Sequence, residues 1–154
     1  MIVVSDTTAL TSLIKAGMEH ILPRLFGDVR ILRAVAGELH RFHSSLPDWC
    51  LVQPAGEGPL LESLREAVDA GEAEAIVLAV DLKAEFVLLD DKKGRRQAEA
   101  SGLTCLVLPA LMVAAKRQGI ITSVAEAFAT LAAKGRYAVA ESTAAVLLRS
   151  AGEM

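Results

Sequence analysis

The chain has 154 residues, of which 53% are hydrophobic and 23% are charged. This length predicts a single domain over residues 1–154 with a sizeable buried core, and the composition excludes extensive disorder. A net charge of −3 excludes a basic surface over the whole molecule. Aromatic residues, at 4%, are too few for a module that holds nucleic acid mainly by stacking on bases.

The mean hydropathy is +0.41, which raises the question of a membrane protein. The longest nearly apolar run is residues 103–115, which is well short of the roughly 20 residues of a spanning helix, so we expect no membrane partner. Cys50 and Cys105 have neither metal-binding nor redox spacing, and the first residues lack the basic region of a signal peptide. We therefore expect a cytoplasmic protein with two buried thiols.

The first 42 residues alternate between short apolar runs and segments with a helical apolar period. Gly17 and Gly27 end the first two helical segments, and the third carries Glu38. In chain order the predicted elements are a strand over 2–4, helices over 8–16 and 19–26, a strand over 29–32 and a helix over 34–42.

The middle of the chain predicts a loop followed by two helices. Residues 44–59 are rich in Ser, Pro, Gly and Asp, which is typical of a loop, and only residues 50–52 predict an edge strand within it. Residues 60–70 predict an amphipathic helix, Gly71 interrupts it, and residues 72–82 predict an Ala-rich helix.

The last third predicts two further strands, over residues 86–89 and 105–108, with Pro109 suited to the first position of a helix. Strands that alternate with helices predict an α/β fold, here a three-layer α/β/α sandwich with a central parallel sheet of four to five strands. The remaining helices are predicted over residues 92–101, 110–118, 123–134 and 139–150.

Carboxylates follow two of the predicted strands. Asp6 ends the first strand, and Asp90 and Asp91 follow the strand that ends at residue 89, so all three project from one edge of the sheet, where such folds bind ligands. Converging carboxylates repel one another unless a divalent cation neutralises them, and oxygen ligands suit Mg²⁺ or Mn²⁺ rather than Zn²⁺. The sequence therefore predicts a metal site that could acidify a water and stabilise charge on a phosphate.

Three glutamates are further candidates for this site. Glu38 lies in the first crossover, and Glu72 and Glu74 follow Gly71 at the start of a predicted helix. We expect the start of that helix to face the edge at which its following strand enters. Both Glu72 and Glu74 also suit a helix N-terminus through the helix dipole, so at least one of them has a purely structural interpretation.

The densest positive charge directly follows Asp91 and consists of Lys92, Lys93, Arg95 and Arg96. These cations predict contacts with the phosphates of a nucleic acid held over the metal. The alternative interpretation is a solvated helix face that binds nothing.

Five stretches carry a resemblance to a known family: IVVSDTT at residues 2–8, AVAGEL at 34–39, GEAEAIVLA at 71–79, LLDDKKGRR at 88–96 and AAKRQGII at 114–121. They resemble the PIN-domain nucleases, in particular short stand-alone prokaryotic members. The resemblance implies a parallel sheet between helices and metal-dependent cleavage of single-stranded RNA. The subgroup's Gly-Thr turn after the last strand is replaced here by Leu108-Pro109-Ala110, a change that removes no acidic residue.

The same resemblance implies metal ligands at Asp6, Glu38 and Asp91. For the remaining acid it favours Glu74, which precedes an Ala-Ile-x-Leu-Ala run as the family's acid does, although Glu72 preserves the spacing to Asp91 better. It also implies a toxin of a toxin–antitoxin pair, held inactive by a small antitoxin protein, and a homodimer. Ala- and Leu-rich segments beyond residue 110 independently predict apolar surface buried between two copies.

Two other functions stay open. The first is phosphoryl transfer through an aspartyl-phosphate, although Thr8 stands where haloacid-dehalogenase-like domains need a second Asp, and the last strand lacks the Lys that receiver domains need. The second is a catalytically inactive PIN-like module that only binds or assembles, against which the retention of every candidate acid argues.

Overall fold

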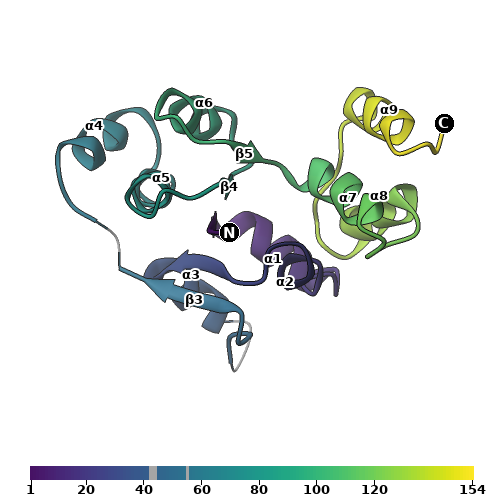
Figure 1. Ribbon diagram of the computed structural model, residues 1–154, viewed down its shortest axis with the longest axis horizontal. Helices are drawn as coiled ribbons and strands as arrows, with labels where there is room; N and C mark the ends of the chain where they lie inside the picture. The colour runs from purple at the N-terminus through teal and green to yellow at the C-terminus, as the bar shows by residue number, and fades with distance from the viewer. Residues whose placement is uncertain (42–44, 55) are drawn as a thin grey trace.

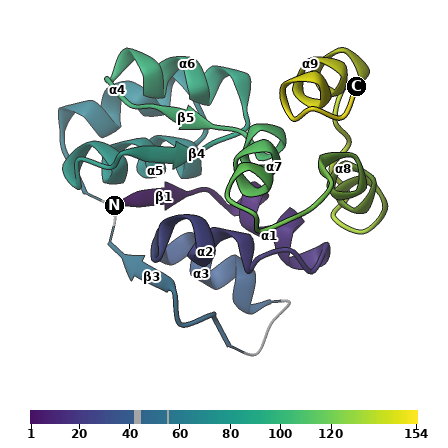
Figure 2. The same cartoon turned by 45° about the vertical axis from the view of Figure 1, so that its right-hand side comes forward.

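The computed structural model describes residues 1–41, 45–54 and 56–154. Five strands form one sheet in the order β3-β2-β1-β4-β5, and every neighbouring pair is parallel. In Figure 2, β5 lies uppermost, β4 and β1 follow below it, and β3 lies lowest. The strands are β1 (Val3–Ser5), β2 (Val29–Leu32), β3 (Cys50–Gln53), β4 (Phe86–Leu88) and β5 (Cys105–Leu106).

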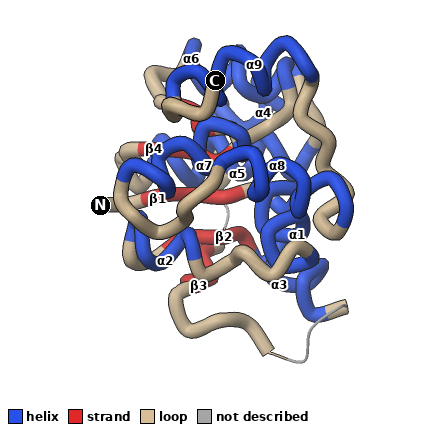
Figure 3. The backbone as a smooth tube through the Cα atoms, turned by 90° about the vertical axis from the view of Figure 1, so that its right-hand side faces the viewer, coloured by secondary structure: helices blue, strands red, loops and turns tan. Residues whose placement is uncertain are grey.

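Helices cover both faces of this sheet, which confirms the predicted α/β/α sandwich (Figure 3). Helix α3 packs against β2 and β3, whereas α5 packs against β1, β2 and β4. The chain first steps from β1 to β3 and then returns across the sheet to β4 and β5, so right-handed crossovers place the two groups of helices on opposite faces. These helices are α1 (Thr7–Lys15), α2 (Ile21–Phe26), α3 (Arg33–His40), α4 (Pro59–Ala67), α5 (Ala70–Asp81) and α6 (Lys92–Ala100).

The last three helices, α7 (Leu108–Arg117), α8 (Val124–Ala133) and α9 (Glu141–Ser150), form a group beside the sheet (Figures 1 and 2). Helix α7 packs against both α8 and α9, and its apolar residues are largely buried. The apolar surface in this half of the chain that suggested a subunit interface is therefore covered in part within the chain. Within the described residues, no helix has the length and apolar character needed to cross a bilayer.

The C-terminus is fastened to this group by Glu153. Its carboxylate accepts hydrogen bonds from the backbone N–H groups of Val124 at 2.7 Å and Ala125 at 3.0 Å, at the start of α8. Lys116 of α7 donates to the same carboxylate at 2.9 Å and to the carbonyl of Ala151 at 2.9 Å. One acidic side chain thus joins α7, α8 and the end of α9.

The predicted elements agree with the structure except at a few boundaries. Strand β5 is two residues shorter than predicted, because the helical turn that contains Pro109 already begins at Leu108. The break between α4 and α5 lies at Val68 and Asp69 rather than at Gly71, because the Asp69 carboxylate accepts the backbone N–H of Glu72 at 2.8 Å and starts α5 there. Phe42, the predicted end of the third helix, and Ser44, the predicted start of the loop, lie outside the described residues.

Candidate active site

The strand order reverses between β1 and β4, and in sheets of this kind ligands bind at that point, outside the carboxyl ends of the strands. Asp6 directly follows β1, and Asp90 lies just beyond the end of β4. The backbone N–H of Asp6 donates to the carbonyl of Leu88 at 3.1 Å, so the two strands stay paired up to the two aspartates. The structure therefore places Asp6 and Asp90 on either side of the switch point.

Among the helices that begin at this edge, α1, α5 and α6 are each capped by an aspartate. Oδ1 of Asp6 accepts the backbone N–H of Ala9 in α1 at 3.0 Å, and Oδ2 of Asp91 accepts that of Gly94 in α6 at 3.0 Å. Asp69 caps α5 in the same way. The helix starts hold these carboxylates in defined positions and direct positive dipole ends toward the same region.

Glu72, in the first turn of α5, lies with these aspartates. Burial, followed by the charges of Asp69 and Asp91 and a hydrogen bond with Asp69, raises the pKa of Glu72 to about 7. The sequence predicted that α5 begins at the edge of the sheet where β4 starts, and this prediction is wrong. A crossover helix runs antiparallel to the strands it connects, so its first turn returns to their carboxyl ends.

Asp6 is similarly affected by its neighbours. Burial and the charges of Asp90 and Asp69 raise the pKa of Asp6 to about 6, although hydrogen bonds from the backbone of Ala9 and Asp90 act in the opposite direction. Two carboxyl groups of one cluster thus hold their protons unusually tightly. Burial accounts for most of this, and the repulsion from neighbouring carboxylates that adds to it is what a bound cation would relieve.

Glu74 is not brought to this cluster. Its Oε1 lies 3.4 Å from Nη2 of Arg65, in an ion pair that joins α5 to α4. Two residues along a helix turn a side chain through about 200°, so Glu72 and Glu74 cannot face the same way. Of the two candidates, the structure places Glu72 rather than Glu74 with Asp6 and Asp91.

Two adjoining clefts run over the carboxylates. One, of about 370 Å³, is lined by Asp6, Asp69 and Glu72, with the exposed Glu38 of α3 on its other wall. The second, of about 280 Å³, is lined by Asp69, Glu72, Asp91 and Lys93, among others. Asp69 and Glu72 line both clefts, so the acidic residues form one continuous surface.

The four cations after Asp91 do not form a uniform patch. Lys92, Lys93 and Arg96 are exposed on α6, and Lys93 reaches the second cleft. Arg95 is half-buried, and its Nε has no hydrogen-bond partner among the described atoms. Its charge lowers the pKa of both Cys105 and Tyr137, against larger effects that raise them, so Arg95 faces inward rather than toward the cleft.

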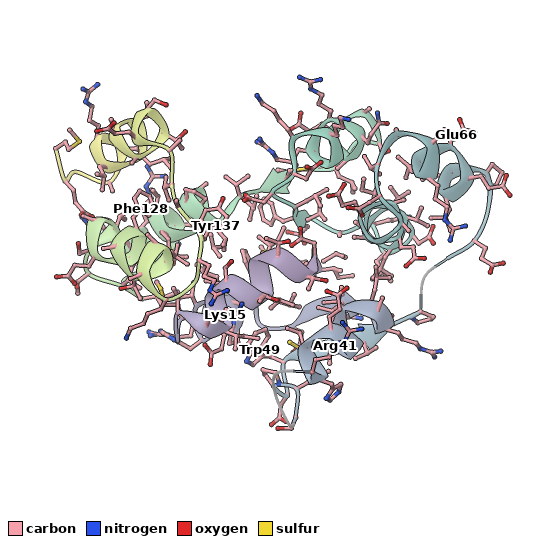
Figure 4. The ribbon with its side chains drawn as sticks, turned by 180° about the vertical axis from the view of Figure 1, so that it is seen from behind. Lys15, Arg41, Trp49, Glu66, Phe128 and Tyr137 are labelled. Carbon is pink, nitrogen blue, oxygen red and sulfur yellow. The ribbon has the colours of Figure 1, made fainter. Side chains whose placement is uncertain are left out.

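The sequence interpretation missed two residues of this site. Asp69 gave a signal, since an aspartate just before an Ala-rich helix is a typical N-cap. Tyr137, in the segment between α8 and α9, gave none. It forms a hydrogen bond with Asp90, and burial and this bond raise the pKa of Tyr137. Figure 4 shows Tyr137 where the C-terminal helices meet the rest of the molecule, far from Glu66 on α4.

Comparison with known proteins agrees with this arrangement. The family model DUF3368, described as a PIN domain, matches residues 2–153. Among solved structures, the chain is similar to a PilT N-terminus domain protein from the hyperthermophilic archaeon Sulfolobus solfataricus P2, with 18% identity and a TM-score of 0.51 over 74% of this chain and 92% of that one. At this identity the likeness shows the fold alone, and curated proteins give no match. The fold is that of a group of proteins that are generally nucleases, and the chain belongs to the PIN-domain family.

Proposed function

We propose that this protein is a divalent-metal-dependent endoribonuclease that cleaves single-stranded RNA. The observation that carries the proposal is the gathering of Asp6, Glu72, Asp90 and Asp91 from three elements at the switch point of the sheet, beside open clefts. A hydrolase that works on a phosphodiester needs such a group of acids only if a cation sits among them.

The donor chemistry of the cluster fits Mg²⁺ or Mn²⁺. Its donors are carboxylate oxygens, which these hard cations prefer. Burial first, and then neighbouring negative charge that a cation would offset, raise the pKa values of Asp6 and Glu72. Among the described residues, no three His, Cys, Asp or Glu side chains stand close enough together to hold one ion as they are positioned here. Binding would therefore draw the carboxylates closer together.

Asp6, Glu72 and Asp91 would hold the ion, with Glu38 and Asp90 as further donors. When bound, a divalent cation lowers the pKa of a coordinated water and offsets charge on a phosphodiester during in-line attack. The chain's own contribution is to fix its acids: the N-cap bonds orient Asp6 and Asp91, and the hydrogen bond with Tyr137 orients Asp90. Lys92, Lys93 and Arg96 would bind phosphates of the RNA from α6, and Arg95 is the least accessible of the four predicted contacts.

The proposal includes a cytoplasmic location, a homodimer, and a role as a toxin inhibited by an antitoxin protein. These rest on kinship with short PIN proteins and, for the dimer, on apolar residues such as Val146, which is 64% exposed on α9. Light scattering at micromolar concentration tests the dimer, since a monomer mass would overturn it. Loss of cleavage on addition of the product of the neighbouring reading frame tests the antitoxin.

The central experiment measures cleavage of labelled single-stranded RNA with Mn²⁺, with Mg²⁺ and with EDTA. We expect cleavage with either metal, none with EDTA, and a loss of at least about 100-fold in Asp6→Asn, which keeps the N-cap but removes the charge. Thermal unfolding with and without Mn²⁺ gives a second readout, because an ion bound by the folded state raises the midpoint. A stable wild-type protein that neither binds Mn²⁺ nor cuts RNA would overturn this proposal. The alternative of a catalytically inactive binding module would then remain.

A further inference from the structure

A groove of about 340 Å³, separate from the two clefts described above, runs along α1. It adjoins the cleft that is lined by Asp6, which is called the acidic cleft below. Thr7, Thr8 and Glu38 line both, so the groove begins where the cleft that holds Asp6 ends. Its far part is bounded by Lys15 at the end of α1 and by Arg136 from the segment after α8. No residue of α6 is among those that line it.

The composition of this groove suits a phosphate. Lys15 and Arg136 are both exposed, and the threonine and serine hydroxyls of α1 lie between them and the acidic cleft. The side chain of Arg136 forms no hydrogen bond or ion pair with any described residue. Hydroxyl groups and cations along a groove are the groups with which proteins hold a nucleic acid backbone.

The backbone presents Arg136 to the groove in an uncommon way. Arg136 has a φ of 52°, in the left-handed region that a residue with a long side chain rarely adopts. Gly135, just before it, packs tightly against the backbone of α1 and α8, since a β-carbon there would lie 2.7 Å from the carbonyl oxygen of Ser12 and 2.9 Å from that of Leu131. The N–H of Tyr137, just after Arg136, donates to the same Leu131 carbonyl at 3.0 Å, so the backbone on both sides of Arg136 is held in place. None of the described residues bonds to the arginine side chain, which leaves it able to contact a ligand in the groove.

We propose that Lys15 and Arg136 bind a backbone phosphate of the RNA strand on the α1 side of the acidic cleft. This inference rests on the proposed function, because RNA that enters the cleft is what supplies the phosphate. A strand lying across the carboxylates then meets cations at both ends, Lys93 of α6 on one side and Lys15 with Arg136 on the other. The segment after α8 thereby becomes part of the substrate site.

The test measures binding of a labelled single-stranded RNA of about 12 nucleotides by fluorescence anisotropy, in EDTA so that the strand stays intact, at several salt concentrations. Arg136→Asn removes the charge and keeps a residue that tolerates the left-handed region, and Lys15→Gln removes the second charge. Lys83→Asn is the matched control, since Lys83 is also exposed, has a φ of 53° and lies between α5 and β4 at the opposite edge.

We expect each groove variant to weaken binding about 5-fold at 0.1 M salt and to reduce the slope of log Kd against log salt by about 0.7, as the loss of one phosphate contact requires. Lys83→Asn should leave both unchanged. Unchanged affinity and slope in Arg136→Asn would overturn the inference even if the wild type cuts RNA, and equal weakening by Lys83→Asn would also overturn it. Weaker binding in the groove variants of a wild type that cuts no RNA would support the groove and overturn the proposed function.

Discussion

The carboxylate of Glu72 lies so close to Gly94 that any larger residue at this position would crowd it. A β-carbon at position 94 would stand 3.2 Å from Oε2 of Glu72 and 3.1 Å from Cδ2 of Leu89. The N–H of Gly94 also donates to Asp91 at 3.0 Å. One residue of α6 therefore positions two carboxylates of the cluster, Asp91 through a hydrogen bond and Glu72 through the space it leaves open.

This contact predicts an unusual effect of Gly94→Ala. Replacing glycine by alanine within a helix ordinarily stabilises a protein by about 1 kcal/mol. Here the added methyl must displace Glu72 or Leu89, so we expect most of that gain to be lost and the affinity for Mn²⁺ to fall about 10-fold. Gly37→Ala in α3 is the control, because nothing lies within 4 Å of its added carbon. Thermal unfolding with and without Mn²⁺ measures both quantities, and identical behaviour of the two variants would contradict the constraint.

Glu72→Gln and Glu74→Gln make the same chemical change two residues apart and separate the two candidate acids. We expect Glu72→Gln to reduce RNA cleavage at least about 100-fold, because it removes a charge from the metal site. Glu74→Gln should keep cleavage and lose only an exposed ion pair with Arg65, worth about 0.2–1 kcal/mol. Cleavage rates at saturating Mn²⁺ decide between them. The reverse result would show that the fourth acid is Glu74.

Glu72 also makes the stability of the metal-free protein depend on pH. Its pKa is about 7 in the folded chain, above the roughly 4.3 of an ordinary glutamate, so the folded state binds its proton more tightly than the unfolded state does. The cost of ionising Glu72 is therefore absent below about pH 4, grows as the pH rises to about 7 and then stays constant. In EDTA, the unfolding midpoint of Glu72→Gln should exceed that of the wild type at pH 8 and match it at pH 4. A difference that does not change with pH would contradict this account.

The parts of the site predicted from sequence are those that depend on local order along the chain. Asp6 and Asp91 follow apolar runs, and parallel strands bring such positions to one edge whatever the details of packing. The choice between Glu72 and Glu74 depended on the rotation of α5 about its axis, which is determined by the residues that this helix buries against the sheet. Family resemblance pointed to Glu74, whereas the spacing to Asp91 pointed to the residue that the structure places in the cleft.

The contribution of the C-terminal helices could not be predicted in this way. Tyr137 lies 47 positions after Asp90 in the chain, and the two meet only because α7 and α8 fold back beside the sheet. No periodicity or motif encodes that contact. Arg136 was missed for the same reason, since its part in the groove depends on how Gly135 packs against α1.

The contacts of Glu153 among the last three helices predict that the stability of the protein falls at acidic pH. Hydrogen bonds from Ala125, Lys116 and Val124 lower the pKa of Glu153 to about 2, below the roughly 4.3 expected in the unfolded chain. A lowered pKa means that the stabilisation by Glu153 is complete above about pH 4.3 and is lost as the pH falls toward 2. Glu153→Gln should therefore be less stable than the wild type at pH 7, with a difference that shrinks between pH 4 and pH 2. Thermal unfolding across this range measures the effect, and a constant difference would show that the carboxylate charge plays no part.

Tyr137→Phe isolates the hydroxyl that bonds to Asp90, since phenylalanine keeps the half-buried ring in place. Losing one hydrogen bond to a partly exposed carboxylate should cost about 1 kcal/mol of stability. Because Asp90 then loses a group that orients it beside the metal ligands, we expect kcat to fall about 10-fold. The affinity for RNA measured in EDTA should not change, whereas Arg136→Asn should weaken that affinity and leave kcat at saturating RNA close to the wild-type value. Neighbouring residues in one segment would then have separable roles, Tyr137 in positioning an acid and Arg136 in holding the strand. A Tyr137→Phe variant with wild-type kcat would show that the hydrogen bond serves only the packing of the C-terminal helices.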